Sequence, residues 1–254
     1  MYRPIAIALL LLISLHCAAE THRSYTAVSP ANRVALLELY TSEGCSSCPP
    51  ADRFISRLRQ GGFDDQHLIP LSFHVTYWDY IGWRDRFANR QYDERQRKQV
   101  QLNGGRTVYT PQFMLNGKDY RRLRNLDEDV SRINSSTAAY KLKLTVMPQA
   151  ESIITELDVS SHIGDRDEAV AYIALYEHGL KSDVIDGEND GETLHHDYVV
   201  RELHGPYVFE QGRGEINTEF ALKDYRLPNS GIVAYVQKLR SSEVLQAVSV
   251  ELGQ

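Results

Sequence analysis

The segment around Cys45 and Cys48 constrains the fold more than any other part of this chain. The apolar run 34–40 predicts a strand, and a Thr-Ser-Glu-Gly stretch interrupts it just before the first cysteine. Pro49 and Pro50 follow the second cysteine, and proline is tolerated in an α-helix only in the first turn. Apolar residues at helical spacing then continue to a Gly-Gly pair. The chain is therefore expected to pass from a strand into a helix at the two cysteines.

The first 19 residues have the pattern of a secretory signal peptide. Arg3 precedes an apolar run from Ile5 to Leu15, and Ala19 ends a stretch of small residues suited to cleavage. The apolar run spans only about half of a bilayer core of roughly 30 Å, which argues against a transmembrane helix. We therefore predict a signal peptide at 1–19, a periplasmic or secreted protein, and no stable membrane span after cleavage.

The chain has three cysteines, and cleavage would remove Cys17. The remaining pair, Cys45 and Cys48, has the C-x-x-C spacing at a helix start. This spacing holds two sulfurs within bonding distance, and a helix N-terminus favours the thiolate. We expect Cys45 to be the exposed nucleophile and Cys48 the covered resolving thiol. A static disulfide and half of a metal site are the alternatives, whereas a four-cysteine zinc site is excluded.

The elements that follow predict an alternation of strands and helices. Residues 68–77 alternate as a strand does, 85–102 read as a solvated helix, and 126–133 form one more helix. Between these helices, Pro111 opens a short strand after Thr110. We predict a cis Thr110-Pro111 bond that packs against the cysteines, with the Thr110 backbone binding an extended substrate chain. An ordinary trans edge-strand proline is the alternative.

After residue 140 the helical signals largely stop. Seven strand candidates follow, at 141–147, 152–160, 169–177, 194–202, 214–221, 231–237 and 244–252. Polar and apolar residues alternate in several of them, as in half-buried antiparallel strands. The segment 140–254 is therefore predicted to be a β-sandwich-like domain.

The net charge argues against nucleic acid as a partner, and the acidic segment 186–192 has two interpretations. The net charge of -6 offers no basic field for a phosphate backbone, so nucleic acid is not an expected partner. Residues 186–192 (Asp-Gly-Glu-Asn-Asp-Gly-Glu) are spaced like a calcium loop, but a strand context and Asp197 at the last ligand position weaken that reading. A solvated acidic loop is the alternative, and no metal or other cofactor is predicted.

Several motifs together resemble a known family. They are Leu-Tyr-Thr-Ser-Glu-Gly-Cys-Ser-Ser-Cys-Pro-Pro-Ala-Asp (39–52), His74-Val75, Tyr77-Trp78-Asp79-Tyr80, Gly82-Trp83, Tyr109-Thr110-Pro111-Gln112, Gly187-Glu188-Asn189 and Val199-Val200-Arg201. This pattern is similar to the secreted bacterial family catalogued as domain of unknown function 1223. The order of elements in 33–134 also resembles a thioredoxin-like domain. The resemblance implies an α/β thioredoxin-like domain at 33–134, followed by the all-β sandwich-like domain at 140–254.

The same resemblance suggests further site residues. Glu38, on the strand that feeds the motif, is a candidate for the buried carboxylate that relays a proton to the resolving thiol of thioredoxin-like proteins. A paired or edge-exposed glutamate is the alternative. His74 and Trp78, at the end of the neighbouring strand, are candidates for lining the site, with core or rim roles as alternatives.

Two functional hypotheses follow from these observations. The first is an exported thioredoxin-like thiol-disulfide oxidoreductase that uses Cys45 and Cys48 on an unidentified exported protein substrate or redox partner. The second is a periplasmic copper-binding or protein-binding module on the same scaffold, without turnover, in which Cys45, Cys48 and His74 would hold soft copper.

Overall fold

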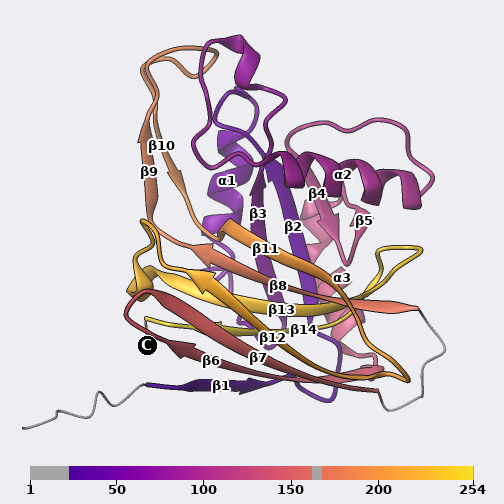
Figure 1. The fold of residues 1–254 in the computed structure, drawn as a ribbon. Coiled ribbons are helices and arrows are strands. Elements are labelled where there is room, and N and C mark those ends of the chain that lie inside the picture. The colour runs from indigo at the N-terminus through magenta and orange to yellow at the C-terminus, as the bar shows by residue number, and fades with distance from the viewer. Residues whose placement is uncertain (1–22, 162–167, 254) are drawn as a thin grey trace, which may run out of the picture.

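The computed structural model describes residues 23–161 and 168–253, so the predicted signal peptide lies outside the described residues (Figure 1). The α-helices are α1 (Pro49–Ser56), α2 (Arg90–Leu102) and α3 (Leu126–Asn134), with short 3-10 turns η1 (Asp79–Ile81), η2 (Leu123–Asn125) and η3 (Leu227–Asn229). The strands are β1 (Tyr25–Val28), β2 (Ala35–Thr41), β3 (Leu68–His74), β4 (Gln112–Leu115), β5 (Lys118–Asp119), β6 (Tyr140–Pro148), β7 (Ser152–Ser161), β8 (Ala169–Glu177), β9 (Leu180–Asp183), β10 (Thr193–His196), β11 (Val199–Val208), β12 (Arg213–Ala221), β13 (Ser230–Lys238) and β14 (Val244–Glu251). Within the described residues, no helix is both long and apolar enough to cross a membrane.

The strands form three sheets. The largest has eight strands in the order β14-β13-β8-β11-β3-β2-β4-β5, the second has the order β1-β6-β7-β12, and β9 and β10 pair only with each other. Within the large sheet, β2 and β3 are parallel, and β11 joins the edge of β3 with Val199 opposite Ser72. This one junction continues the sheet from the first half of the chain into the second.

The predicted fold class, an α/β thioredoxin-like domain followed by an all-β sandwich-like domain, is wrong. The protein is mainly β, and β2 to β5 are part of one mixed sheet with β8, β11, β13 and β14. The physical reason is that the open edge of β3 is paired by β11, which leaves the two halves of the chain hydrogen-bonded to each other. Local periodicity predicts single strands but carries no information about such pairing between distant segments.

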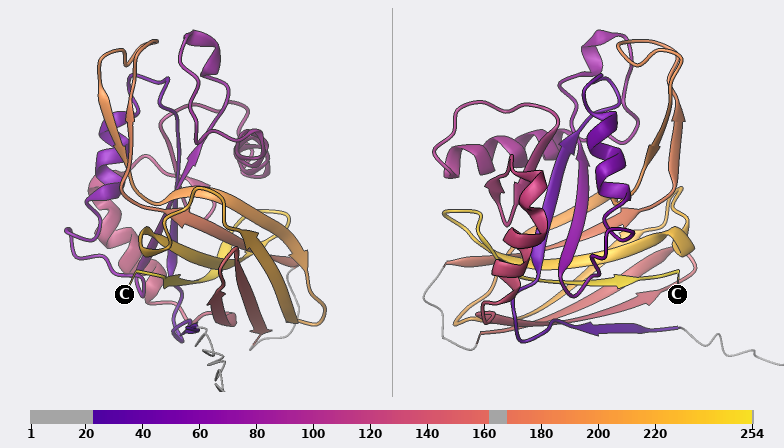
Figure 2. Two further views of the ribbon diagram at one scale, coloured as in Figure 1. Left: turned by 60° about the vertical axis from the view of Figure 1, so that its left-hand side comes forward. Right: turned by 180° about the vertical axis from the view of Figure 1, so that it is seen from behind.

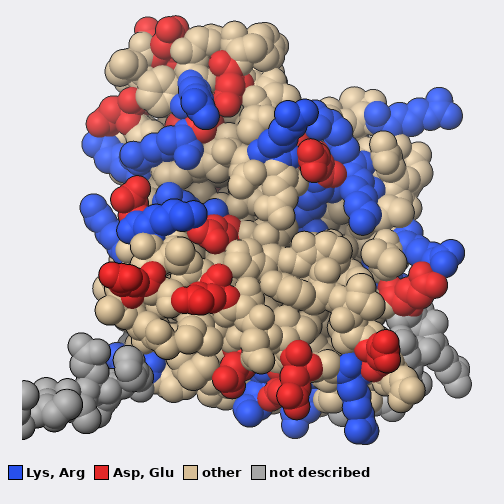
Figure 3. All heavy atoms as spheres, in the orientation of Figure 1, with Lys and Arg blue, Asp and Glu red and all other residues tan. Residues whose placement is uncertain are grey.

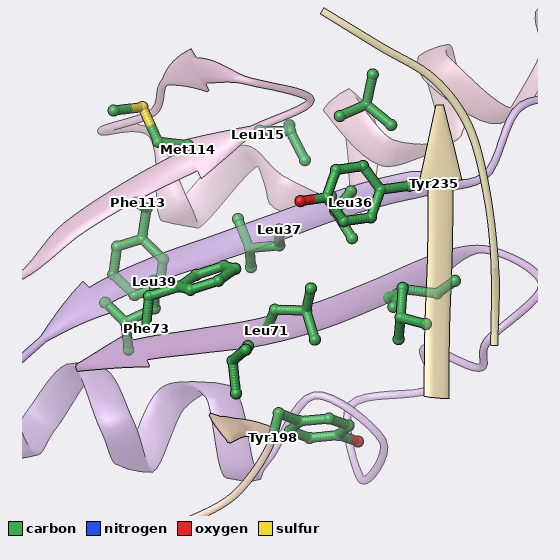
Figure 4. Packing of buried hydrophobic residues seen from close by; sticks show 14 of the residues in the cluster. Leu36, Leu37, Leu39, Leu71, Phe73, Phe113, Met114, Leu115, Tyr198 and Tyr235 are labelled. Atoms are coloured by element: carbon green, nitrogen blue, oxygen red, sulfur yellow. The ribbon is translucent and has the colours of Figure 1, made fainter. Parts of the chain in front are cut away.

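Two hydrophobic cores explain why β8 and β13 are buried on both faces. In β8, Ile173 and Leu175 face the core shared with the β1-β6-β7-β12 sheet, whereas Tyr172 and Tyr176 face the core beneath β2 and β3. The residues of β13 also alternate between the two cores. Tyr235 of β13 lies in the core beneath β2 and β3, where it packs with leucines of β2 (Figure 4). A central strand buried on both faces has an unbroken apolar run, as the sequence of β8 does.

Most predicted elements form, with small shifts. The helix predicted at 85–102 begins only at Arg90, where the Asn89 side chain caps it by accepting from Gln91 N at 3.0 Å. The strand predicted at 194–202 is two strands, β10 and β11, which separate at Tyr198 with φ of 57°. β1 and β9 were not predicted. Both are short, so they offer little periodicity to detect.

The first half of the chain places the cysteines at the end of the sheet. Thr41 and His74 are in register at the carboxyl ends of β2 and β3, and α1 starts a few residues after β2. Figure 2 shows α1 and α3 on one face of these strands and α2 on the other. The β9-β10 hairpin rises from the second half of the chain and packs along α1 (Figure 1). Side chains from both halves therefore meet at the C-x-x-C segment.

Candidate functional site

Cys45 and Cys48 form a single tight turn that leads into α1. The Cys48 backbone N–H donates to the Cys45 carbonyl at 3.1 Å, and Cys48 is the N-cap residue of the helix. Both side chains are free thiols, and the Cys45 sulfur lies 3.3 Å from the Ser47 hydroxyl. The free amide groups of a helix start are close enough to stabilise negative charge on sulfur.

The two thiols differ in acidity. The hydrogen bond from Cys48, opposed by burial and aided by the hydroxyls of Ser47 and Thr110, lowers the pKa of Cys45 to about 6. Burial, together with the hydrogen bond and charge of Cys45 and the charge of Asp52, raises the pKa of Cys48 well above its usual value. Cys45 is therefore the thiolate at neutral pH and Cys48 keeps its proton.

The expectation that Cys45 is exposed is wrong, because only 1% of its surface is accessible. Thr110 covers the sulfur from one side, and the Thr110 hydroxyl in turn accepts a hydrogen bond from Trp78 Nε1 at 2.6 Å. Ser46 and Ser47 beside it are exposed. The nucleophile thus lies just beneath the surface rather than on it.

The tip of the β9-β10 hairpin, residues 186–191, also covers the motif, and we call it the covering loop. The buried side chain of Asn189 donates to the carbonyl of Glu43 at 2.7 Å and to that of Cys45 at 3.2 Å. Glu188 accepts from the Ser46 N–H at 3.0 Å. The loop that was compared with a calcium site instead makes hydrogen bonds to the cysteine turn. Across the described residues, no three acidic, histidine or cysteine side chains are grouped to hold a metal ion.

The Thr110-Pro111 peptide bond is cis, as the sequence predicts, and it lies next to the cysteine pair. Thr110 makes side-chain hydrogen bonds to both thiols. Trp78 is half-buried and holds Thr110 through its indole N–H. The structure therefore brings together Cys45, Cys48, Thr110, Pro111 and Trp78.

Glu38 is placed in a buried ion pair. Its Oε1 accepts from Arg95 Nε at 2.8 Å, and its Oε2 accepts from Gln99 Nε2 at 2.7 Å. Arg95 lies over the rings of Tyr172 and Tyr235, at 4.9 and 5.4 Å from their centres. Both carboxylate oxygens are therefore engaged by α2, which corresponds to the paired alternative rather than to a relay.

His74 lies in a buried polar cluster behind the cysteine turn. Its Nδ1 is 2.6 Å from Asp85 Oδ2, and its ring meets that of His196 edge to face at 4.9 Å. Burial lowers the pKa of His74, but the charge and hydrogen bond of Asp85, together with the charges of Asp52 and Glu43, outweigh burial and raise it. Asp85 also accepts from the backbone N–H of Glu43 at 2.9 Å. His74 therefore supports the loop that carries the cysteines.

Sequence reasoning missed several residues of this site. The sequence places Asn189 and Glu188 in an acidic motif and in the family resemblance but predicts no contact with the cysteines, although polar side chains next to glycines are typical of a tight turn. Trp83 donates to Glu43 Oε2 at 2.8 Å, and this bond turns the Glu43 carboxylate toward the histidine cluster. No local signal in the sequence pairs Trp83 with Glu43.

The fold and site define a class: a mainly β protein with a C-x-x-C turn at the start of a helix, covered by a hairpin from the other half of the chain. A family model described as "Protein of unknown function (DUF1223)" matches residues 36–237. The chain belongs to this family. A search of curated proteins gives no match.

Two solved structures share the fold. Protein AGR_C_4864 from Agrobacterium tumefaciens is 21% identical with a TM-score of 0.64, and the match covers 89% of this chain and 97% of that one. HBP35 of Porphyromonas gingivalis is 15% identical with a TM-score of 0.65, over 89% of this chain and 77% of that one. At these identities the likeness concerns the fold alone.

Proposed function

We propose that this protein is an exported thiol-disulfide oxidoreductase that acts on protein thiols or disulfides through Cys45 and Cys48. The observation that carries the proposal is the difference between the two thiols, since a lowered pKa of Cys45 to about 6 supplies a nucleophile beside a protonated partner. A static structural pair of cysteines has no need for this difference.

The reaction follows from these two states. The Cys45 thiolate attacks one sulfur of a partner disulfide, forms a mixed disulfide, and releases the other sulfur as a thiolate that takes a proton from solvent. Cys48 then loses its proton and attacks the Cys45 sulfur, which releases the second partner sulfur. The protein ends with a Cys45-Cys48 disulfide and the partner with two thiols, so two electrons have passed to the partner; the reverse sequence oxidises a dithiol.

Substrate contact would come from the segments that surround the cysteines. The Thr110 and Pro111 backbone forms a bend next to Cys45, just before β4, and we expect it to offer hydrogen bonds to a partner chain in the β conformation. Two large apolar side chains near the same region are exposed. Tyr80, in η1, is exposed by 81%, and Ile185, just before the covering loop, is exposed by 79%. Because Cys45 is buried, a protein partner reaches it only after a local opening of this cover.

The surface shown in Figure 3 carries charges of both signs. Lys and Arg gather over α2, whereas elsewhere on the described part of this face they are interspersed with Asp and Glu. The mixed part of the face produces no strong single-sign field to steer an anionic or cationic partner. The donor set for copper gains no support from the site either, because no three His, Cys, Asp or Glu side chains of the described residues are grouped to hold a metal ion.

The test is turnover with a protein disulfide. With dithiothreitol as the reductant, the purified mature protein should accelerate the reduction of insulin disulfides, because a thiolate at neutral pH attacks faster than a thiol. Cys45→Ser should abolish the acceleration, and Ser46→Ala, a change of the exposed neighbour, should keep it. If wild type and Cys45→Ser reduce insulin at the same rate as buffer with dithiothreitol, the proposal is wrong.

A further inference from the structure

Cys48 has a buried carboxylate one helical turn away. Cys48 is the N-cap of α1 and Asp52 follows four residues later, so the two side chains lie on the same face of the helix. Side chains of a helix lean toward its N-terminus, which directs Asp52 back over the turn that carries Cys48. Asp52 is only 5% exposed, its Oδ1 makes no hydrogen bond of good geometry, and the Thr41 hydroxyl is close enough to lower its pKa.

Asp52 contacts a histidine from the hairpin. His196, at the end of β10, places Nδ1 3.8 Å from Asp52 Oδ2 and Nε2 3.2 Å from Glu43 Oε1. The three side chains are buried, and neither ring nitrogen of His196 makes a hydrogen bond of good geometry. Buried polar atoms without partners are rare in folded proteins and call for a reason, such as a catalytic role.

We propose that Asp52 accepts the proton of Cys48 when Cys48 resolves a mixed disulfide, and that His196, which lies between the carboxylates of Asp52 and Glu43, positions Asp52. This inference rests on the proposed function and adds to it the group that activates the second thiol. His196 acts through Asp52 and is a positioning residue.

Protons and electrons balance in this step. The Cys48 thiol gives its proton to the Asp52 carboxylate and becomes a thiolate. The thiolate attacks the Cys45 sulfur of the mixed disulfide, the Cys45-Cys48 bond forms, and the bond between Cys45 and the partner breaks. The partner sulfur leaves with the bonding electron pair and takes the proton from Asp52, directly or through water. The partner disulfide is the oxidant of the whole reaction.

Asp52 suits this role better than Glu38. Burial raises the pKa of Asp52, although His196 and His74 oppose the rise. A raised pKa makes the Asp52 carboxylate a stronger base and so better able to take a proton from a thiol. Both oxygens of Glu38, by contrast, already accept hydrogen bonds from α2. The groups that face Asp52 are Cys48 on its own helix and, from the packed elements, His74 of β3, Asp85, His196 of β10 and Glu43.

The experiment separates the two thiols in time. Ellman's reagent, an aromatic disulfide, releases one coloured thiolate when Cys45 attacks and a second when Cys48 resolves the adduct. In reduced Asp52→Asn, we expect an unchanged first phase and a second phase that is slower by about 10- to 100-fold at neutral pH. The difference should shrink as the pH rises, because hydroxide increasingly replaces the missing base and removal of the Asp52 charge favours the Cys48 thiolate.

Controls distinguish a base from a structural residue. Asp129→Asn changes another buried helix aspartate, which pairs with Tyr120 and Arg122 away from the cysteines, and should leave both phases unchanged. Asp52→Asn should unfold at a temperature no lower than wild type at neutral pH, since burial penalises the ionised carboxylate. His196→Gln should slow the second phase less than Asp52→Asn and shift its pH midpoint.

The outcomes are separable. An Asp52→Asn second phase with the rate and pH profile of wild type would overturn the role of Asp52 while leaving the proposed function intact. A wild-type protein that releases no second thiolate, or none at all, would instead contradict the proposed function. Equal slowing in Asp129→Asn and Asp52→Asn would also overturn the role of Asp52, because it would show a general effect of buried aspartate loss.

Discussion

Replacing Cys48 with serine is expected to leave Cys45 joined to glutathione in a stable mixed disulfide. When reduced Cys48→Ser meets oxidised glutathione, Cys45, which keeps the hydrogen bonds of Ser47 and Thr110 that favour its thiolate, attacks and forms the adduct. Serine cannot resolve it, so nearly all of the protein should carry one glutathione by intact mass. Wild type should instead form the internal disulfide, because the neighbouring thiol reacts intramolecularly with a high effective concentration.

Cys45→Ser is the matched control for this prediction. Burial and the charge of Asp52 raise the pKa of Cys48 without any help from Cys45, so a lone Cys48 should stay largely unmodified under the same conditions. Adducts on Cys45→Ser together with none on Cys48→Ser would show that the roles of the two thiols are reversed.

The second large effect concerns stability. Glu38→Gln removes the carboxylate that pairs with Arg95. In the wild type, Glu38 Oε1 lies 2.7 Å from Arg95 Nη2, and the Arg95 side chain is only 6% exposed. A buried guanidinium without its counter-charge is costly, so we expect a loss of roughly 3–5 kcal/mol in the free energy of unfolding. Such a loss corresponds to a decrease in Tm of roughly 6–20 °C for a chain of this size. Urea or thermal unfolding followed by circular dichroism measures it.

An exposed ion pair provides the comparison. Glu94→Gln removes the partner of Arg90, with which it forms a 3.9 Å contact one turn apart on the surface of α2. Exposed pairs contribute little, so this variant should stay within about 0.5 kcal/mol of wild type. If Glu38→Gln is no less stable than Glu94→Gln, the Glu38 carboxylate is not held by Arg95 in the way the structure shows.

The elements of the fold could be predicted from the sequence because their signals are local. The prolines after Cys48 mark the start of α1, and the unbroken apolar run of β8 marks a central strand. The junction between β11 and β3 has no such signal, since it depends on Val199 meeting Ser72 more than a hundred residues away. The predicted fold class, an α/β thioredoxin-like domain followed by an all-β sandwich-like domain, failed at this junction.

In the site too, features that depend on nearby residues could be predicted from the sequence, whereas contacts between distant segments could not. The motif order predicts Thr110 and Pro111 beside Cys45, and the structure places them there. The partner of Glu38 is on α2 and the cover of Cys45 comes from the β9-β10 hairpin, so neither follows from spacing along the chain. His195 and His196 are neighbours on β10 and therefore point to opposite faces of the strand, so His195 is exposed whereas His196 is buried. That His196 meets Asp52 is a consequence of how the hairpin packs on α1.

The most direct test of thiol-disulfide exchange at Cys45 and Cys48 is a redox equilibrium with glutathione. The fraction of the two free thiols would be measured by alkylation and intact mass across buffers of reduced and oxidised glutathione, approached from both the reduced and the oxidised protein. We expect both thiols to disappear together and reversibly, with a midpoint that depends on the square of the reduced glutathione concentration divided by the oxidised concentration, because one internal disulfide forms. Thiols that stay free in every buffer, or that only become glutathionylated independently of each other, would contradict the account.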